Sequence, residues 1–134
     1  MECVIARRAL DVVTVQARAE APRECCGLLV GSGVSIVDAV PGRNIAASAT
    51  TRYLLDPQDH ITTLRNARQR GAEIVGFYHS HPTTPAVPSE TDRAEASYPG
   101  FLYLIVSLTM QPPDAQLYRL VDGNFHQIRF VTVD

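Results

Sequence analysis

The most informative stretch of this sequence is residues 73–92, EIVGFYHSHPTTPAVPSETD. Its first nine residues are largely apolar and predict a buried strand over 73–81. Three prolines follow, and because each removes a backbone donor and fixes φ, residues 82–88 cannot form a helix or a central strand. Ser89 is a preferred N-cap residue with acidic side chains just after it, which predicts a short helix over 89–97. The stiff loop can therefore bring the start of this helix back over the end of the strand.

The histidine pair within this stretch has the spacing of metal ligands. Residues i and i+2 of a strand point to the same face, so His79 and His81 present two imidazoles side by side. This pattern alone also fits a polar strand face exposed to solvent, but the proline-rich loop and the offset from Ser89 to Asp92 favour a metal site. Asp92, in the first turn of the expected helix, is the candidate third ligand. Two histidines and one carboxylate leave one position of a zinc ion open for water, which is typical of catalytic zinc.

A hydrolytic zinc site also needs a general base, and Glu24 is the candidate. It stands directly before the apolar run CCGLLVG at 25–31, where an acidic residue is unexpected unless its carboxylate has a function. Its position equally fits an ordinary surface residue at a junction between a helix and a strand. The other acids that stay open as candidates for the base are Glu2, Glu20, Glu73, Glu90 and Glu95. His60 and His126 have no candidate ligand at a useful spacing, and we interpret them as structural residues.

The remaining sequence predicts an α/β fold with a mixed β-sheet. Besides 73–81, apolar and alternating runs predict strands over 2–5, 25–31, 34–40, 52–56, 101–108, 116–121 and 124–133. Helices are expected over 7–20, ended by Pro22, and from Pro57 to residue 70, closed by Gly71. With no internal repeat and no linker, residues 1–134 are expected to form a single domain in which helices flank the sheet.

Composition and charge exclude several classes of protein. The chain has 134 residues, of which 46% are hydrophobic and 19% charged, which is typical of a globular rather than a disordered protein. A formal net charge of −2 gives no support for nucleic-acid binding, which requires a concentrated basic surface. No apolar run is long enough to span a membrane and the first residues do not resemble a signal peptide, so a cytoplasmic protein is expected. The three cysteines, an odd number with Cys25 and Cys26 adjacent, fit a reducing compartment, and Cys25 and Cys26 are interpreted as core residues.

The candidate site residues together resemble the signature of a known enzyme family. Glu24, the run His79-Ser80-His81-Pro82, Ser89 and Asp92 match E…HxHPx6SxxD, the signature of the JAMM (MPN+) metalloproteases. The resemblance covers residues 1 to about 130, and the further stretches that carry it are ECCGLLVG, Asn44 before a loop of small residues, YLLDP and GFYHSHP. It implies a JAMM/MPN domain with a cytidine-deaminase-like fold, of the short prokaryotic type.

The resemblance also implies a role for each matching residue. His79, His81 and Asp92 correspond to the ligands of one zinc ion per chain. Glu24 corresponds to the general base that takes a proton from water and delivers it to the leaving amine. Ser89 corresponds to the residue that hydrogen-bonds the oxyanion, although its position is also that of a helix N-cap.

The implied activity is zinc-dependent hydrolysis of a peptide or isopeptide bond after the C-terminal Gly-Gly tail of a small ubiquitin-like or sulfur-carrier protein, for example the release of cysteine from a carrier. An extended tail can add to the edge of a sheet, and loop 42–51 with strand 52–55 is the expected wall of its groove. Residues 93–101 are few and lack Cys and His, so the insertions of polyubiquitin-specific members are missing. Two alternatives stay open: a DNA-associated protein of the RadC-like branch, and a zinc-bound interaction module without turnover. A deaminase is excluded because HxE and PCxxC are absent.

Overall fold

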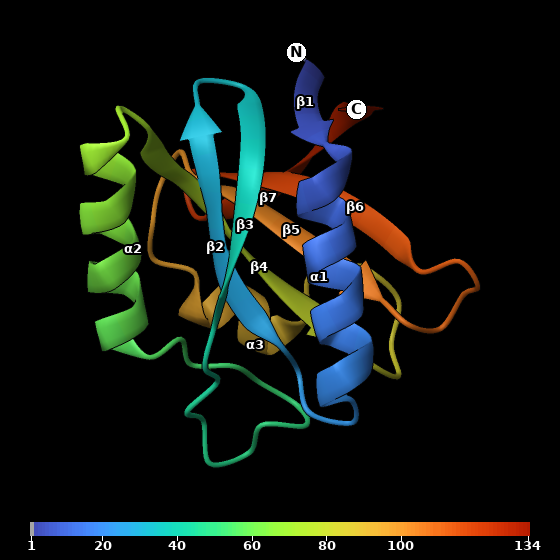
Figure 1. The fold of residues 1–134 in the computed structure, drawn as a ribbon. Helices are drawn as coiled ribbons and strands as arrows, with labels where there is room; N and C mark the ends of the chain where they lie inside the picture. The colour runs from blue at the N-terminus through green and yellow to red at the C-terminus, as the bar shows by residue number, and fades with distance from the viewer. Residues whose placement is uncertain (1) are drawn as a thin grey trace.

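Strands and helices are interspersed along residues 2–134, which are the residues that this computed structural model describes (Figure 1). The strands are β1 (Glu2–Ala6), β2 (Cys26–Ser32), β3 (Ser35–Gly42), β4 (Glu73–His81), β5 (Leu102–Ser107), β6 (Asp114–Val121) and β7 (Asn124–Val133). The helices are α1 (Arg7–Glu20), α2 (Pro57–Gln69) and α3 (Glu90–Glu95). No helix among the described residues is both long enough and apolar enough to cross a membrane.

The strands form a closed barrel in the order β1-β3-β2-β4-β5-β6-β7. β1 runs parallel to β3 and β7, and β4 runs parallel to β5, whereas the other neighbours are antiparallel. The expected mixture of parallel and antiparallel strands is therefore confirmed, but the expected sheet closes into a barrel. Closure comes from the pairing of β1 with β7, in which Glu2 lies opposite Arg129. β4 lies between β2 and β5, so neither of its edges is free to accept another strand.

The helices α1 and α2 pack on opposite faces of the sheet. Ala9, Val13 and Ala17 recur every four residues along α1 and lie in a core that includes Leu29 of β2. The neighbouring Leu28 belongs to a second core, against which α2 packs. In Figure 1 the two helices lie on either side of the β2–β3 hairpin. Alternation along each strand thus divides its side chains between the two helices.

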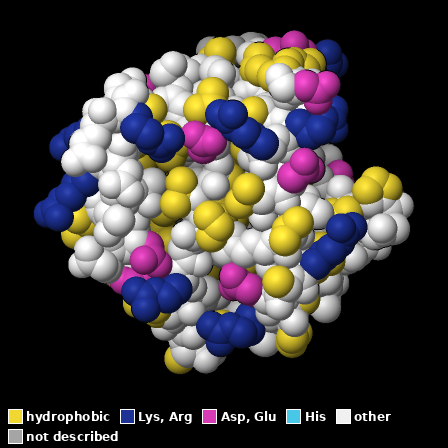
Figure 2. Space-filling model, viewed as in Figure 1, with side chains coloured by type: hydrophobic (Ala, Val, Ile, Leu, Met, Phe, Trp, Pro, Cys, Tyr) yellow, Lys and Arg dark blue, Asp and Glu magenta, His cyan; other side chains and the backbone are white. Residues whose placement is uncertain are grey.

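One ion-pair network joins the two helices across β3. Asp38 lies 3.3 Å from the guanidinium of Arg8 in α1 and 3.3 Å from that of Arg70, the C-cap residue of α2. Figure 2 shows this face of the molecule, where basic and acidic side chains are interspersed with small apolar patches. The pairs are largely exposed, so each contributes at most about 1 kcal/mol to stability.

Local sequence signals set most of the element boundaries. Asp56 caps α2 by accepting a hydrogen bond from Gln58 N, Pro57 takes the first helical position, and Gly71 ends the helix with a φ of 73°. The expected strand over 52–56 is wrong, because this segment forms only an isolated bridge between Asn44 and Leu55. The N-cap of α2 follows at once, so the pairing has no room to extend.

Candidate active site

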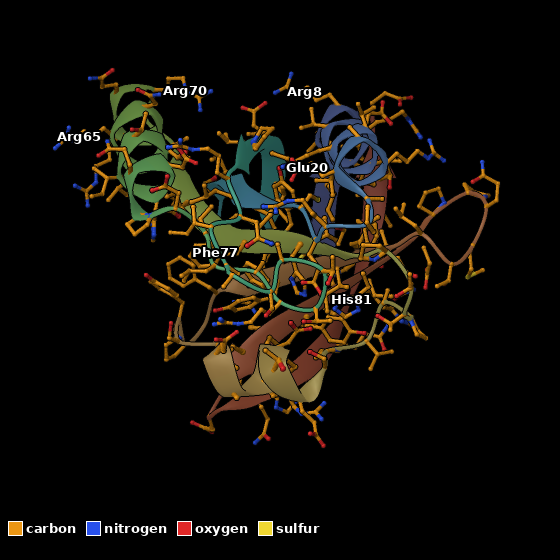
Figure 3. All side chains as sticks on the ribbon, turned by 90° about the horizontal axis from the view of Figure 1, so that it is seen from below. Arg8, Glu20, Arg65, Arg70, Phe77 and His81 are labelled. Carbon is orange, nitrogen blue, oxygen red and sulfur yellow. The ribbon has the colours of Figure 1, made fainter. Side chains whose placement is uncertain are left out.

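β4 places the two histidines in the interior of the protein. Phe77, His79 and His81 alternate with Tyr78 and Ser80 along the strand, and the two histidine side chains are only 2% and 3% exposed. Their Nε2 atoms lie 3.2 Å apart. Figure 3 shows Phe77 and His81 spaced along β4, on the side of the sheet where α3 lies. The strand alternation therefore brings the two imidazoles together, as the sequence predicts.

The start of α3 brings Asp92 onto the histidine pair. Ser89 Oγ accepts a hydrogen bond from Asp92 N at 3.0 Å, while Asp92 Oδ2 accepts one from Ser89 N at 2.9 Å, which is a capping box. The same Asp92 Oδ2 lies 3.1 Å from His79 Nε2 and 3.0 Å from His81 Nε2. The helix cap thus fixes the orientation of the carboxylate toward both imidazoles.

The geometry of this cluster fits a single metal ion. One nitrogen from each histidine and one oxygen from Asp92 lie 3.0 to 3.2 Å from one another. Two atoms that each lie 2.0–2.1 Å from a tetrahedral zinc are about 3.3 Å apart. His81 Nδ1 lies 2.7 Å from Pro85 O and donates to it, which leaves Nε2 as the unprotonated ligand atom.

Burial and hydrogen bonding shift the pKa values of the three cluster residues in different directions. Burial lowers the pKa of His79 despite the opposing effect of Asp92, so this imidazole is neutral. Burial also disfavours charge on His81, but hydrogen bonds to Asp92 and to the Pro85 carbonyl outweigh burial and raise its pKa. Although burial opposes it, hydrogen bonding to His79 and His81 holds the pKa of Asp92 far below its ordinary value. The cluster therefore offers one anionic oxygen and one neutral imidazole, and a metal ion that binds His81 must displace a proton from it.

Glu24 lies beside this cluster in an environment that disfavours its charge. The residue is 6% exposed, and its Oε1 has no hydrogen-bond partner among the described residues. Burial raises its pKa to about 7, with a further rise from Asp92 and an opposing effect from His81. A buried carboxylate without a partner is costly, so a function is the better explanation of its presence. Of the alternative acids, Glu2, Glu73, Glu90 and Glu95 are exposed and Glu20 is half-buried.

Glu24→Gln is expected to stabilise the metal-free protein at pH 8 but not at pH 4. The folded-state pKa of about 7 exceeds the ordinary value of 4.5, so the folded protein binds the proton more tightly and its stability falls as pH rises between these values. Above pH 7 the ionised carboxylate costs up to about 3 kcal/mol, which the neutral amide avoids. Thermal unfolding of both proteins without metal measures this difference. An equal difference in Tm at both pH values would contradict it.

An aromatic pocket next to the cluster was missed by the sequence reasoning. Tyr53 stacks on His79 with ring centroids 4.4 Å apart. Tyr53 and Asp92 both line a cavity of about 470 Å³, whose other walls come from Leu54, Leu55, Pro57, His60, Phe77, Glu95, Ser97, Tyr98 and Tyr103. His60, interpreted from the sequence as a structural residue, contacts Phe77 and Tyr98 in this pocket. In the sequence, Tyr53 of YLLDP is the one signal that could have indicated this side of the cavity.

The cysteines take no part in the cluster. Cys25 and Cys26 are fully buried and unpaired, and burial raises the pKa of their thiols to about 11 and 12. Their interpretation as core residues is confirmed. His126 is exposed on β7.

Fold and site together define a class of protein. The fold is a barrel of parallel and antiparallel strands, and it holds a buried cluster of two histidines and one carboxylate with a second buried carboxylate beside it. These groups are the ones that a hydrolytic metal centre requires. This chain belongs to the prokaryotic homologs of the JAB domain, whose family model matches residues 6–121. The resemblance to the short prokaryotic JAMM proteins is thereby confirmed.

Relatives with names and structures fit this assignment. The chain is 43% identical over 93 residues to the desampylase of Haloferax volcanii, a match that covers 68% of this chain and 67% of that protein. It is 35% identical over 126 residues to the CysO-cysteine peptidase of Mycobacterium tuberculosis, covering 90% of this chain and 84% of the relative. The solution structure of protein DSY2949 from Desulfitobacterium hafniense superposes with a TM-score of 0.88 at 28% identity, covering 100% of this chain and 94% of that one.

Proposed function

We propose that this chain is a zinc-dependent metallopeptidase that hydrolyses the peptide or isopeptide bond after the Gly-Gly tail of a small ubiquitin-like or sulfur-carrier protein. The observation that carries the proposal is the buried cluster of His79, His81 and Asp92 with the buried Glu24 beside it, whose Oε1 has no hydrogen-bond partner among the described residues. The names of the relatives, a desampylase and a CysO-cysteine peptidase, support this class of substrate.

In this proposal the site residues divide the work of hydrolysis. His79, His81 and Asp92 hold one zinc ion, which when bound supplies a Lewis acid and makes water more acidic. Glu24 takes the proton of the attacking water and delivers it to the leaving amine, and its pKa of about 7 suits both transfers near neutral pH. Ser89 is exposed, and its Oγ accepts from Asp92 N. Because a hydroxyl can accept one hydrogen bond while it donates another, Ser89 can cap α3 and still donate to the oxyanion.

Ser89→Ala is expected to lower turnover by about 10²–10³-fold, with a much smaller effect on substrate affinity, because an oxyanion donor acts mainly in the transition state. Loss of the N-cap alone costs about 1 kcal/mol of stability. Steady-state kinetics and thermal unfolding separate the two roles. If only the Tm falls while kcat is normal, Ser89 serves only as the cap.

The extended segment next to the pocket is the proposed wall for the substrate tail. β4 is paired on both sides, so the tail cannot add to the barrel there. Residues 53–55 are held by residues 43–45, with Ile45 N donating to Leu54 O at 2.8 Å, and they line the cavity beside His79. Because the Tyr53 ring already stacks on His79, a chain that reaches the cluster along this wall has little room for a Cβ, and glycine is the residue that tolerates such an approach.

The proposal is tested with purified zinc-loaded protein on four substrates: a carrier–cysteine adduct, a carrier joined to a lysine side chain, diubiquitin, and the first adduct with a bulky residue in place of the penultimate glycine. Cleavage of the two carrier substrates, with poor cleavage of the other two, is expected. Equal rates on diubiquitin and the carrier adduct would overturn the substrate range. No cleavage of any substrate would favour the zinc-bound interaction module. A salt-dependent shift of duplex DNA would favour the RadC-like alternative.

A further inference from the structure

Asn44 is a buried polar residue that connects several backbone segments around the candidate site. It is 6% exposed and lies in the loop after β3, separated from the strand end at Gly42 by Arg43. Its Nδ2 donates to Glu24 O at 2.9 Å, Arg52 O at 3.1 Å and Ala49 O at 3.5 Å, and its Oδ1 accepts from Ala46 N and Leu54 N at 3.0 Å each. Few side chains satisfy so many backbone groups, and such a fully bonded buried network fixes local geometry.

The placement of Glu24 depends on this network. Its N–H donates to Ala49 O at 2.7 Å and its carbonyl accepts from Asn44, so the loop after β3 holds both backbone polar groups. In contrast, the Glu24 carboxylate has an oxygen with no partner among the described residues. Because no hydrogen bond fixes that oxygen, the carboxylate is positioned mainly through its backbone.

The same amide also sets the wall opposite the histidines. Arg52 O and Leu54 N, which flank Tyr53, both bond to Asn44. The Tyr53 ring stacks on His79. One side chain therefore couples the position of Glu24 to that of the aromatic residue that covers a candidate metal ligand.

From these contacts we propose that Asn44 is a positioning residue, which acts through Glu24 and Tyr53 and touches neither substrate nor metal. The inference rests on the proposed function for its kinetic consequence, while the hydrogen-bond coupling itself is independent of activity. A misplacement of a catalytic group by about 1 Å can cost on the order of 10²-fold in rate. Asn44→Ala is expected to lower kcat by about that factor, to change KM by less than about threefold and to leave the zinc content unchanged.

Two comparisons separate positioning from a merely structural role. In a Glu24→Gln background the same Asn44→Ala change is expected to cost much less, because the group that it positions is already inactive. Equal losses in both backgrounds, or a normal kcat with only a lower Tm, would overturn the proposal. Asn44→Asp is the second variant, and it replaces Asn44→Ala if the alanine variant does not fold. Its side chain has the size of asparagine, but at pH 8 it is a carboxylate and cannot donate a hydrogen bond to Glu24 O. Asn66→Ala, at an exposed position on α2, is the matched control with unchanged kinetics.

Amide hydrogen exchange of the metal-free protein gives a readout that needs no substrate. Exchange at Glu24 and at residues 49–54 is expected to become faster in the Asn44 variants, while exchange in β5 stays the same. Unchanged exchange at Glu24 would refute the coupling whether or not the protein is a peptidase. If the wild-type protein cleaves no carrier adduct while exchange is faster in the Asn44 variants, the proposed function and the kinetic role of Asn44 are both refuted. The hydrogen-bond coupling would then still stand.

Discussion

Purified His81→Ala protein is expected to contain almost no zinc, whereas the wild type contains close to one equivalent per chain. His81 Nε2 lies 3.2 Å from His79 Nε2 and 3.0 Å from Asp92 Oδ2, so its removal leaves two ligands and opens one side of the cluster. The change also removes the hydrogen bond from His81 Nδ1 to Pro85 O, which in the wild type fixes the tautomer of the imidazole. Metal analysis after dialysis measures the loss, and peptide hydrolysis should fall to background with it.

The control for this experiment is His126→Ala. His126 lies exposed on β7 and carries no contact to the cluster residues, so this variant should keep its zinc and its activity. A chelator should inactivate the wild type, and added zinc should restore it. Full zinc content in the His81→Ala protein would show that the ligand assignment is wrong.

The part of the site that the sequence predicts rests on short-range spacing. His79 and His81 share a face because strand side chains alternate, and Asp92 reaches them because a proline-rich loop leads into a capped helix start. These relations hold within twenty residues of the chain. The aromatic pocket could not be found this way, because His60 reaches Phe77 only through the packing of α2 against β4.

In the fold, too, features set by neighbouring residues could be predicted, whereas pairings between distant segments could not. The bounds of α1 and β4 match the expected 7–20 and 73–81, since amphipathic period and flanking prolines and glycines are local signals. Closure of the barrel depends on the pairing of β1 with β7, whose residues lie at opposite ends of the chain. Residues 52–56 have strand composition, but composition does not tell whether a partner strand is present, and here only one bridge forms.

Glu24→Gln is expected to retain zinc and the fold but to lose about 10²–10⁴-fold in kcat, the usual contribution of general acid–base catalysis. The amide has nearly the size of the carboxylate, and because Oε1 has no hydrogen-bond partner among the described residues, no contact of that atom is broken. What the amide cannot do is accept a proton from water. The loss should therefore appear in kcat on the carrier–cysteine adduct, with KM and metal content close to the wild-type values.

The matched control is Glu20→Gln, which tests the alternative acid at the end of α1. Glu20 accepts a hydrogen bond from Gln16, as an amide oxygen also can, so the change should leave both structure and turnover intact. The two variants together distinguish a general base from a nearby structural acid, since each exchanges one carboxylate oxygen for a nitrogen. If Glu24→Gln turns over at a near-normal rate, another group accepts the proton. Among the alternative candidate acids only Glu20 is not exposed, so a loss confined to Glu20→Gln would transfer that role to it.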